Sequence, residues 1–179
     1  MVFAENVCLQ RMNILQNEKE RFCIFNYAII MKPLIVLLTA FGLTAAVCKV
    51  ATGLWQVHAS GNIAMGVMLL FTAMGHFKFT QGMTMMIPSV IPYKVTLVYL
   101  TGVAEIVLGI ALFFPALRLV AGIALITLLI LLLPANIWAA MRQINFETGG
   151  HGKGPSYLIF RIPLQLFFIG WIWYFAIRP

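Results

Sequence analysis

Long apolar stretches, separated by short polar segments, dominate the pattern of this 179-residue chain. Charge-free runs include residues 33–48, 50–77, 106–117, 119–141 and 162–177. A helix needs roughly 20 apolar residues to cross about 30 Å of hydrocarbon. The pattern therefore predicts an all-α fold, a polytopic membrane helix bundle with spans at about residues 33–51, 62–79, 95–115, 119–141 and 157–177.

The segments between these spans set the connectivity of the predicted bundle. We expect an N-terminal tail at residues 1–32 and a single transmembrane domain at residues 33–179. In the loop after the second span, Pro88 and Pro92 exclude a continuous helix. We expect irregular chain there, lying along the membrane interface or dipping back into the bundle. The turn at residues 115–118 is short, so the third and fourth spans should form an antiparallel hairpin. A glycine-rich connection at residues 143–156 leads to the last span.

Two alternatives concern the N-terminal part of the chain. Residues 1–30 are interpreted as an upstream extension before a natural start at Met31, or as a short cytoplasmic tail; an amphipathic surface helix is the less favoured alternative. Residues 33–51 also resemble a cleavable signal peptide, because small residues follow an apolar core. A lipoprotein cleavage site needs a small residue where Val47 stands, so a retained helix is favoured.

Composition strengthens the membrane assignment. Hydrophobic residues make up 62% of the chain and charged residues 9%, against about 25% charged in an ordinary soluble domain. The net charge of +7 comes from Lys and Arg spread singly along the chain, which argues against nucleic acid and leaves the lipid bilayer as the predicted partner. Because basic loops stay on the cytoplasmic side, we expect an inner (cytoplasmic) membrane protein with its N-terminus inside and its C-terminus outside.

The cysteine and histidine patterns give little support to thiol or metal chemistry. The three cysteines include no C-x-x-C pair, which argues against a dithiol or thiolate metal site: Cys8, Cys23 and Cys48. The three histidines lie on different predicted segments. We therefore expect no metal, and no cofactor is evident, although the chemistry discussed below suits a quinone.

Polar side chains inside the predicted spans are the candidates for a site. A charge at a helix centre costs about 2.5 to 3.5 kcal/mol on insertion scales, so such residues mark functional positions. Glu105 lies about 15 Å deep in its span, and Gly102 and Gly109 on its face direct it toward other helices. We expect Arg161 to be within reach of Glu105. The predicted polar pocket, in the cytoplasmic half, draws on four helices: His76, Glu105, Asn136, Arg161 and Gln165.

A structural interpretation of the same residues stays open. Asn136 and Gln165 would then hydrogen-bond across helices, an interaction worth about 0.6 to 2 kcal/mol. His76 would be an interfacial histidine. Glu105 with Arg161 would be a clamp that fixes the helix register without doing chemistry.

Four segments of the chain carry a resemblance to a known family. They read GNIAMGVMLLFTAMGHFKFTQGMTMMIPSVIP, LTGVAEIVLGIALFFPALR, LLLPANIWAAM and FRIPLQ. With them, residues 61–178 resemble the DoxX-like membrane proteins, in particular their short uncharacterised bacterial members. The resemblance implies a four-helix bundle, here after one extra N-terminal span, and the five candidate residues match the polar positions of its motifs. The family takes its name from a subunit of a thiosulfate:quinone oxidoreductase. Other members are linked to redox complexes or, in animals, to receptor assembly.

Two functions follow as expectations. The first is a membrane subunit or accessory protein of a quinone-linked redox system, in which the polar pocket binds a small amphipathic molecule. The second is a non-enzymatic assembly or scaffold protein whose buried polar residues are structural; other subunits of a membrane complex, or further copies of the chain, would be its partners. A small transporter is less favoured, because the sequence shows no inverted repeat.

Overall fold

The computed structural model describes residues 31–142 and 156–178. The predictions for the tail at residues 1–30 and for the connection at residues 143–155 fall outside these ranges. The chain divides into two units, Met1–Lys32 and Pro33–Pro179. All regular elements of the described residues are helices, with no strand among them, which confirms the predicted all-α class.

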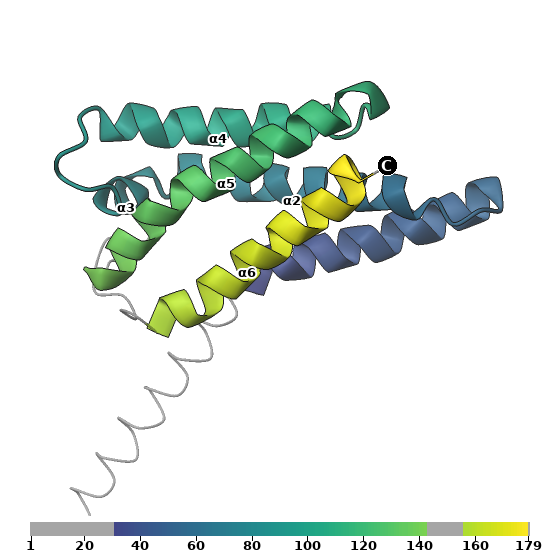
Figure 1. Ribbon diagram of the computed structural model, residues 1–179, viewed down its shortest axis with the longest axis horizontal. Helices are drawn as coiled ribbons and strands as arrows, with labels where there is room; N and C mark the ends of the chain where they lie inside the picture. The colour runs from purple at the N-terminus through teal and green to yellow at the C-terminus, as the bar shows by residue number, and fades with distance from the viewer. Residues whose placement is uncertain (1–30, 143–155, 179) are drawn as a thin grey trace, which may run out of the picture. The chain divides into compact units, whose positions relative to one another are not determined.

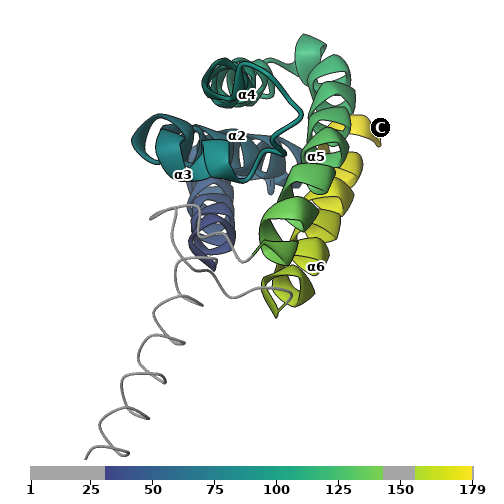
Figure 2. The same ribbon diagram turned by 90° about the vertical axis from the view of Figure 1, so that its left-hand side faces the viewer.

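Four long helices and several short ones make up the described part of the chain (Figure 1). The first helix, Met31–Thr52, precedes α2. In chain order the further elements are α2 (Val57–Lys78), α3 (Thr80–Met85), α4 (Lys94–Ala111), the 3-10 turn η1 (Pro115–Leu117), α5 (Arg118–Met141), α6 (Ser156–Ile172) and the π-helical turn η2 (Trp173–Ile177). Both views show α4 alongside α2 and α6 alongside α5 (Figures 1 and 2).

Some helix limits differ from the limits expected from the sequence. The loop after α2 is not wholly irregular, because Thr80–Met85 forms a six-residue helix, α3. The prolines act only after it, where the backbone turns and Tyr93 adopts the left-handed conformation with a φ of 54°. α2 begins at Val57, ahead of the expected start at residue 62, and α4 ends at Ala111. The chain then turns through three residues into η1, and the Arg118 Nε group donates to the Leu112 carbonyl over 3.2 Å.

Four helices are long and apolar enough to cross a membrane: Met31–Thr52, Val57–Lys78, Lys94–Ala111 and Pro115–Met141. The last apolar stretch, Arg161–Ile177, is shorter. Their outward faces carry large apolar side chains, such as Leu43, Val120 and Leu131, each exposed by about two thirds. Many large apolar side chains exposed on long apolar helices are compatible with a membrane protein.

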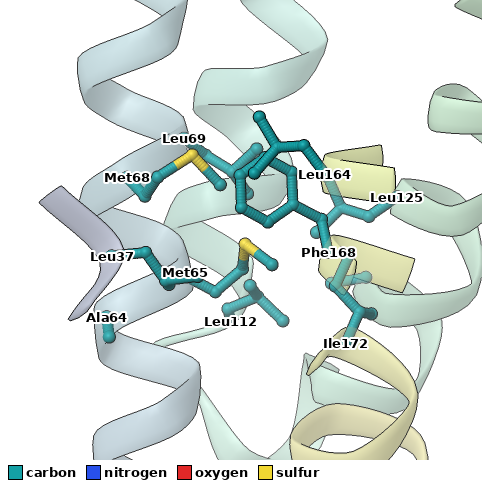
Figure 3. Packing of buried hydrophobic residues seen from close by; sticks show 11 residues of the cluster. Leu37, Ala64, Met65, Met68, Leu69, Leu112, Leu125, Leu164, Phe168 and Ile172 are labelled. Atoms are coloured by element: carbon teal, nitrogen blue, oxygen red, sulfur yellow. The ribbon is translucent and has the colours of Figure 1, made fainter. Parts of the chain in front are cut away.

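A small apolar core joins the helices of the second unit (Figure 3). Met65 and Leu69 from α2 meet Leu125 from α5 and Phe168 from α6 in this cluster. Leu37 of the first helix is fully buried against the same cluster. The core thus holds the first helix, α2, α5 and α6 together, while α4 is placed mainly by its contact with α2.

Glycines allow α2 and α4 to approach each other closely. A Cβ atom on Gly66 would lie 2.6 Å from the Gly109 carbonyl oxygen, and one on Gly102 would lie 2.8 Å from the His76 Cβ atom. Real Cβ atoms do not come this near to other atoms, so only glycine fits at these two positions. The contacts of Gly66 with Gly109 and of His76 with Gly102 set an antiparallel register. That register determines which side chains face each other across the two helices.

The end of the chain is anchored on the first turns of α2. The Trp171 indole N–H donates to the Gly61 carbonyl over 3.1 Å, and the Asn62 amide nitrogen donates to the Phe175 carbonyl over 2.7 Å. Near a helix terminus a carbonyl lacks its regular partner, so Asn62 satisfies a group that the π-helical turn leaves open. A buried asparagine thereby fixes η2 against α2.

The close approach of α2 and α4 makes Gly66→Ala destabilising. The added methyl group would meet the Gly109 carbonyl and the Phe113 ring, and overpacking of this kind costs about 1 to 3 kcal/mol. We expect a lower thermal unfolding midpoint in detergent. Gly42→Ala is the matched control, because its Cβ would meet nothing within 4 Å; it should be neutral or stabilising. Equal effects of the two substitutions would contradict the close approach.

Candidate functional site

His76 and Glu105 form the centre of the candidate site. His76 lies near the end of α2 and Glu105 lies in the middle of α4. The His76 Nε2 atom lies 3.3 Å from the Glu105 Oε1 atom, and the two side chains are 13% and 11% exposed. The antiparallel register brings them together, because the missing side chain at Gly102 lets the backbone of α4 pass directly over His76.

Two threonines complete the hydrogen bonding of this pair. The Thr72 hydroxyl lies one turn before His76 and donates to the Glu105 Oε2 atom over 3.1 Å. The Thr101 hydroxyl lies 3.2 Å from the His76 Nδ1 atom. Each atom of the pair that can hydrogen-bond therefore has a neighbour from α2 or α4. A buried polar group without such a partner would cost about 1 to 3 kcal/mol.

The Val98 carbonyl oxygen lies 3.2 Å from the His76 Nδ1 atom and favours a proton on it. A carbonyl oxygen can only accept, and a bare ring nitrogen can only accept, so the two would repel each other. With Nδ1 protonated, a second proton has to lie between Nε2 and Oε1, because two bare acceptor atoms in contact would repel each other. Whether that proton sits on the imidazole or on the carboxyl, the pair as a whole carries no net charge. A neutral pair is the form least costly in apolar surroundings.

Of the other predicted site residues, Gln165 lies at a helix contact away from this pair. Its amide nitrogen donates to the Leu129 carbonyl of α5. Pro134 has no N–H group, so it leaves the next carbonyl along the helix, that of Ile130, without its helical donor. Gln165 therefore ties α6 to α5 beside the proline, as the structural interpretation of this residue expects. Asn136 is buried on α5, and within the described residues no contact joins it to His76 or Glu105.

Arg161 is partly buried on α6. In the described ranges it forms no ion pair with Glu105, whose neighbours are His76 and Thr72. The structure thus brings together two of the five predicted residues, from α2 and α4, and not the four-helix gathering that we expected.

Sequence reasoning left Thr101 out and did not place Thr72 in the site. A threonine in an apolar helix usually bonds to its own backbone, so neither one stands out. The spacing holds a usable signal, since each lies four residues from a member of the pair on the same helix face. Sequence reasoning also missed Ser60 and Asn62, which are 0% and 1% exposed at the other end of α2. They precede or begin the expected span and so looked like interfacial residues.

The arrangement can hold and exchange one proton. An imidazole and a carboxyl group in contact are the commonest groups for general acid–base chemistry. Hydroxyl donors on both sides can stabilise either protonation state. No cluster of three metal-ligating side chains occurs among the residues that the structure describes.

Comparison with known protein families gives a match to part of the chain. A family described as "Domain of unknown function (DUF8561)" matches residues 65–176, which is more than half of the chain. The matched region contains both His76 and Glu105 and reaches into η2. No curated protein and no solved structure matches the chain.

A double-mutant cycle tests which residue is the partner of Glu105. We expect His76→Gln and Glu105→Gln to be coupled by about 1 kcal/mol or more, because residues in contact share one hydrogen-bond network. Arg161→Gln with Glu105→Gln should be additive within about 0.5 kcal/mol. Unfolding midpoints in detergent would supply the energies. Coupling to Arg161 rather than to His76 would show that the pairing described above is wrong.

Proposed function

The chain belongs to the DUF8561 family, and on that premise we propose that it is an integral membrane protein with an intramembrane proton-exchange site. In this proposal it is a DoxX-like subunit or accessory protein of a quinone-linked redox system. The His76–Glu105 pair binds a small amphipathic molecule of the quinone class and exchanges a proton with it. The single observation that carries the proposal is the 3.3 Å contact between the His76 Nε2 and Glu105 Oε1 atoms.

Location supports this proposal. The pair lies between two helices that are long and apolar enough to cross a membrane. Ionisable groups are rare at such positions and usually belong to a proton or substrate pathway. Quinones dissolve in membranes, so a quinone in the bilayer can reach a binding site between apolar helices.

The chemistry of the pair also suits a quinone. A quinone carbonyl accepts a hydrogen bond, and its reduction takes up protons. An imidazole N–H can donate to that carbonyl, and the carboxyl can resupply the proton. The part of this chain is to bind the molecule and to exchange a proton, while redox subunits of the complex supply the electrons. Because the pair is mostly buried, the molecule has to enter between the two side chains or replace one of their contacts.

A specific observation favours a second candidate, a non-enzymatic assembly protein. Both ring nitrogens of His76 and both oxygens of Glu105 already have neighbours in the protein. In this candidate function, the saturated pair only locks α2 to α4. The bound partner would then be another membrane protein, and the apolar faces of the helices would be the contact surface.

Quinone-dependent stabilisation of the purified protein tests the first candidate. A soluble ubiquinone analogue at about 100 times its dissociation constant stabilises a folded protein by about 2.7 kcal/mol. We expect a clear rise in the unfolding midpoint of the wild type and none for Glu105→Gln. Thr127→Val is the matched control, because Thr127 is exposed on α5 and bonds only to the Ile123 carbonyl; it should respond like the wild type.

The two candidates predict different results for the same variants. An unchanged wild-type midpoint at saturating analogue, together with a lowered intrinsic stability of Glu105→Gln, would support the assembly function. Equal shifts in the wild type and in Glu105→Gln would mean that a quinone binds elsewhere, and would overturn the proposed site.

A further inference from the structure

Each end of the His76–Glu105 pair faces a threonine with a choice of two acceptors. The Thr72 hydroxyl lies 3.0 Å from the Leu69 carbonyl of its own helix and 3.1 Å from the Glu105 Oε2 atom. The Thr101 hydroxyl lies 2.9 Å from the Val98 carbonyl of its own helix and 3.2 Å from the His76 Nδ1 atom. A hydroxyl carries a single hydrogen, so each threonine donates to one of its two neighbours at a time.

The arrangement of the proton-bound pair follows from the Val98 carbonyl. Nδ1 carries a hydrogen that faces the Val98 and Thr101 oxygens, and a second proton lies between Nε2 and Oε1. Thr101 then has to donate to Val98, because Nδ1 offers it no lone pair. The pair is neutral as a whole, and Thr72 can donate either to Leu69 or to the carboxyl.

Loss of one proton from the pair changes the hydrogen-bond acceptors within reach of both threonines. Starting from the imidazolium and the carboxylate, the Nδ1 proton leaves to a water molecule, which becomes hydronium. The remaining hydrogen on Nε2 stays with the carboxylate, and the pair has a net charge of −1. The bare Nδ1 atom would now repel the Val98 oxygen unless a donor reached it. The Thr101 hydroxyl is the donor in reach.

We propose that Thr101 and Thr72 are hydroxyl switches that allow the pair to release and rebind its proton. On release, Thr101 turns from the Val98 carbonyl to Nδ1, and Thr72 turns from the Leu69 carbonyl to Oε2. On rebinding, Thr101 turns back. Both threonines are positioning residues, since they act through His76 and Glu105.

The switch favours proton release because it supplies a hydrogen-bond donor to each group that release leaves without one. Each carbonyl that is left still has its regular helical donor four residues along the chain. The hydrogen bond that Thr72 gains goes to a carboxylate whose charge is no longer balanced, and bonds to ionised groups are roughly twice as strong as neutral ones. The hydrogen bond that Thr101 gains is a neutral one, and it gives the bare Nδ1 atom a donor beside the Val98 oxygen, which would otherwise repel it. Without the threonines, a negative charge would stay uncompensated among apolar helices.

Among the described residues, no charged side chain other than His76 forms an ion pair with Glu105. Lys78 at the end of α2 lies over the Phe79 ring, and the Tyr99 ring on α4 packs at a tilt against Phe77. α3 contains no titratable side chain. Within the described residues, the other basic side chains of the helices that pack on α2 and α4 form no ion pair with Glu105: Lys94, Arg118, Arg161 and Arg178.

The inference rests on the proposed proton-exchange site, and NMR of the imidazole tests it separately. The full chain, with 15N-labelled histidine, is placed in phospholipid nanodiscs, and the His76 signals are identified by their loss in His76→Asn. In the wild type, raising the pH should convert a ring protonated on Nδ1 into one with a bare, hydrogen-bonded Nδ1 atom and a proton on Nε2. His58, which is exposed, serves as the internal reference.

Removal of the Thr101 or Thr72 hydroxyl should make proton release from the His76–Glu105 pair less favourable. At any pH where both states are present, Thr101→Val should lower the ratio of released to bound pair by about tenfold, which corresponds to about 1.4 kcal/mol. Thr101→Ser should restore the wild-type ratio, and Thr72→Val should lower it in the same direction. Thr39→Val is the matched control, because Thr39 is exposed and bonds to the Ile35 and Val36 carbonyls without a charged neighbour.

Three results would overturn the inference. If Thr101→Val and Thr72→Val release the proton as readily as the wild type, the threonines are not switches, while the proton-exchange site still stands. A loss of thermal stability in Thr101→Val with an unchanged ratio would assign the threonine a purely structural role. If the wild-type His76 signals do not change with pH at all, the switch and the proton-exchange site both fail.

Discussion

The close contact between α2 and α4 is the constraint on which the rest of the site depends. Glycine is needed at Gly66 and Gly102 because a Cβ atom there would meet the facing helix at less than 3 Å. Two helices that approach this closely have little freedom to slide, since every side chain along the seam has one facing position. The register therefore decides that His76 meets Glu105. Replacing one small residue would change the chemistry as well as the packing.

Neutrality explains why a titratable pair can stay buried at this seam. A lone carboxylate or a lone imidazolium among apolar helices would be costly, but together the two groups need only one shared proton to cancel their charges. The Val98 carbonyl favours the tautomer that makes this possible, and the threonines supply the remaining hydrogen bonds. In the proposed function, the proton on Nδ1 is the one that this pair exchanges. A structural and a chemical role are thus consistent with each other at this site.

The sequence predicts features that depend on residues close together in the chain. It does not predict contacts that depend on which helices lie side by side. The apolar runs predicted an all-α chain with long hydrophobic helices, and the glycines around Glu105 correctly indicated a face packed on another helix. The expectation that Arg161 lies within reach of Glu105 rested on depth alone, because hydrophobicity does not say which helices touch. Asn62 was missed for a related reason. Its burial comes from the end of the chain folding back on α2, which no local pattern encodes.

One specific arrangement of side chains, the contact between His76 and Glu105, lies within the region that matches the family. Solid-state NMR of the protein in lipid bilayers tests that arrangement most directly, through the dipolar coupling between the 15N-labelled His76 Nε2 atom and the 13C-labelled Glu105 carboxyl carbon. The pairing of His76 with Glu105 predicts a measurable coupling, because the Nε2 and Oε1 atoms lie 3.3 Å apart. Absent coupling to Glu105 in a folded protein would contradict it.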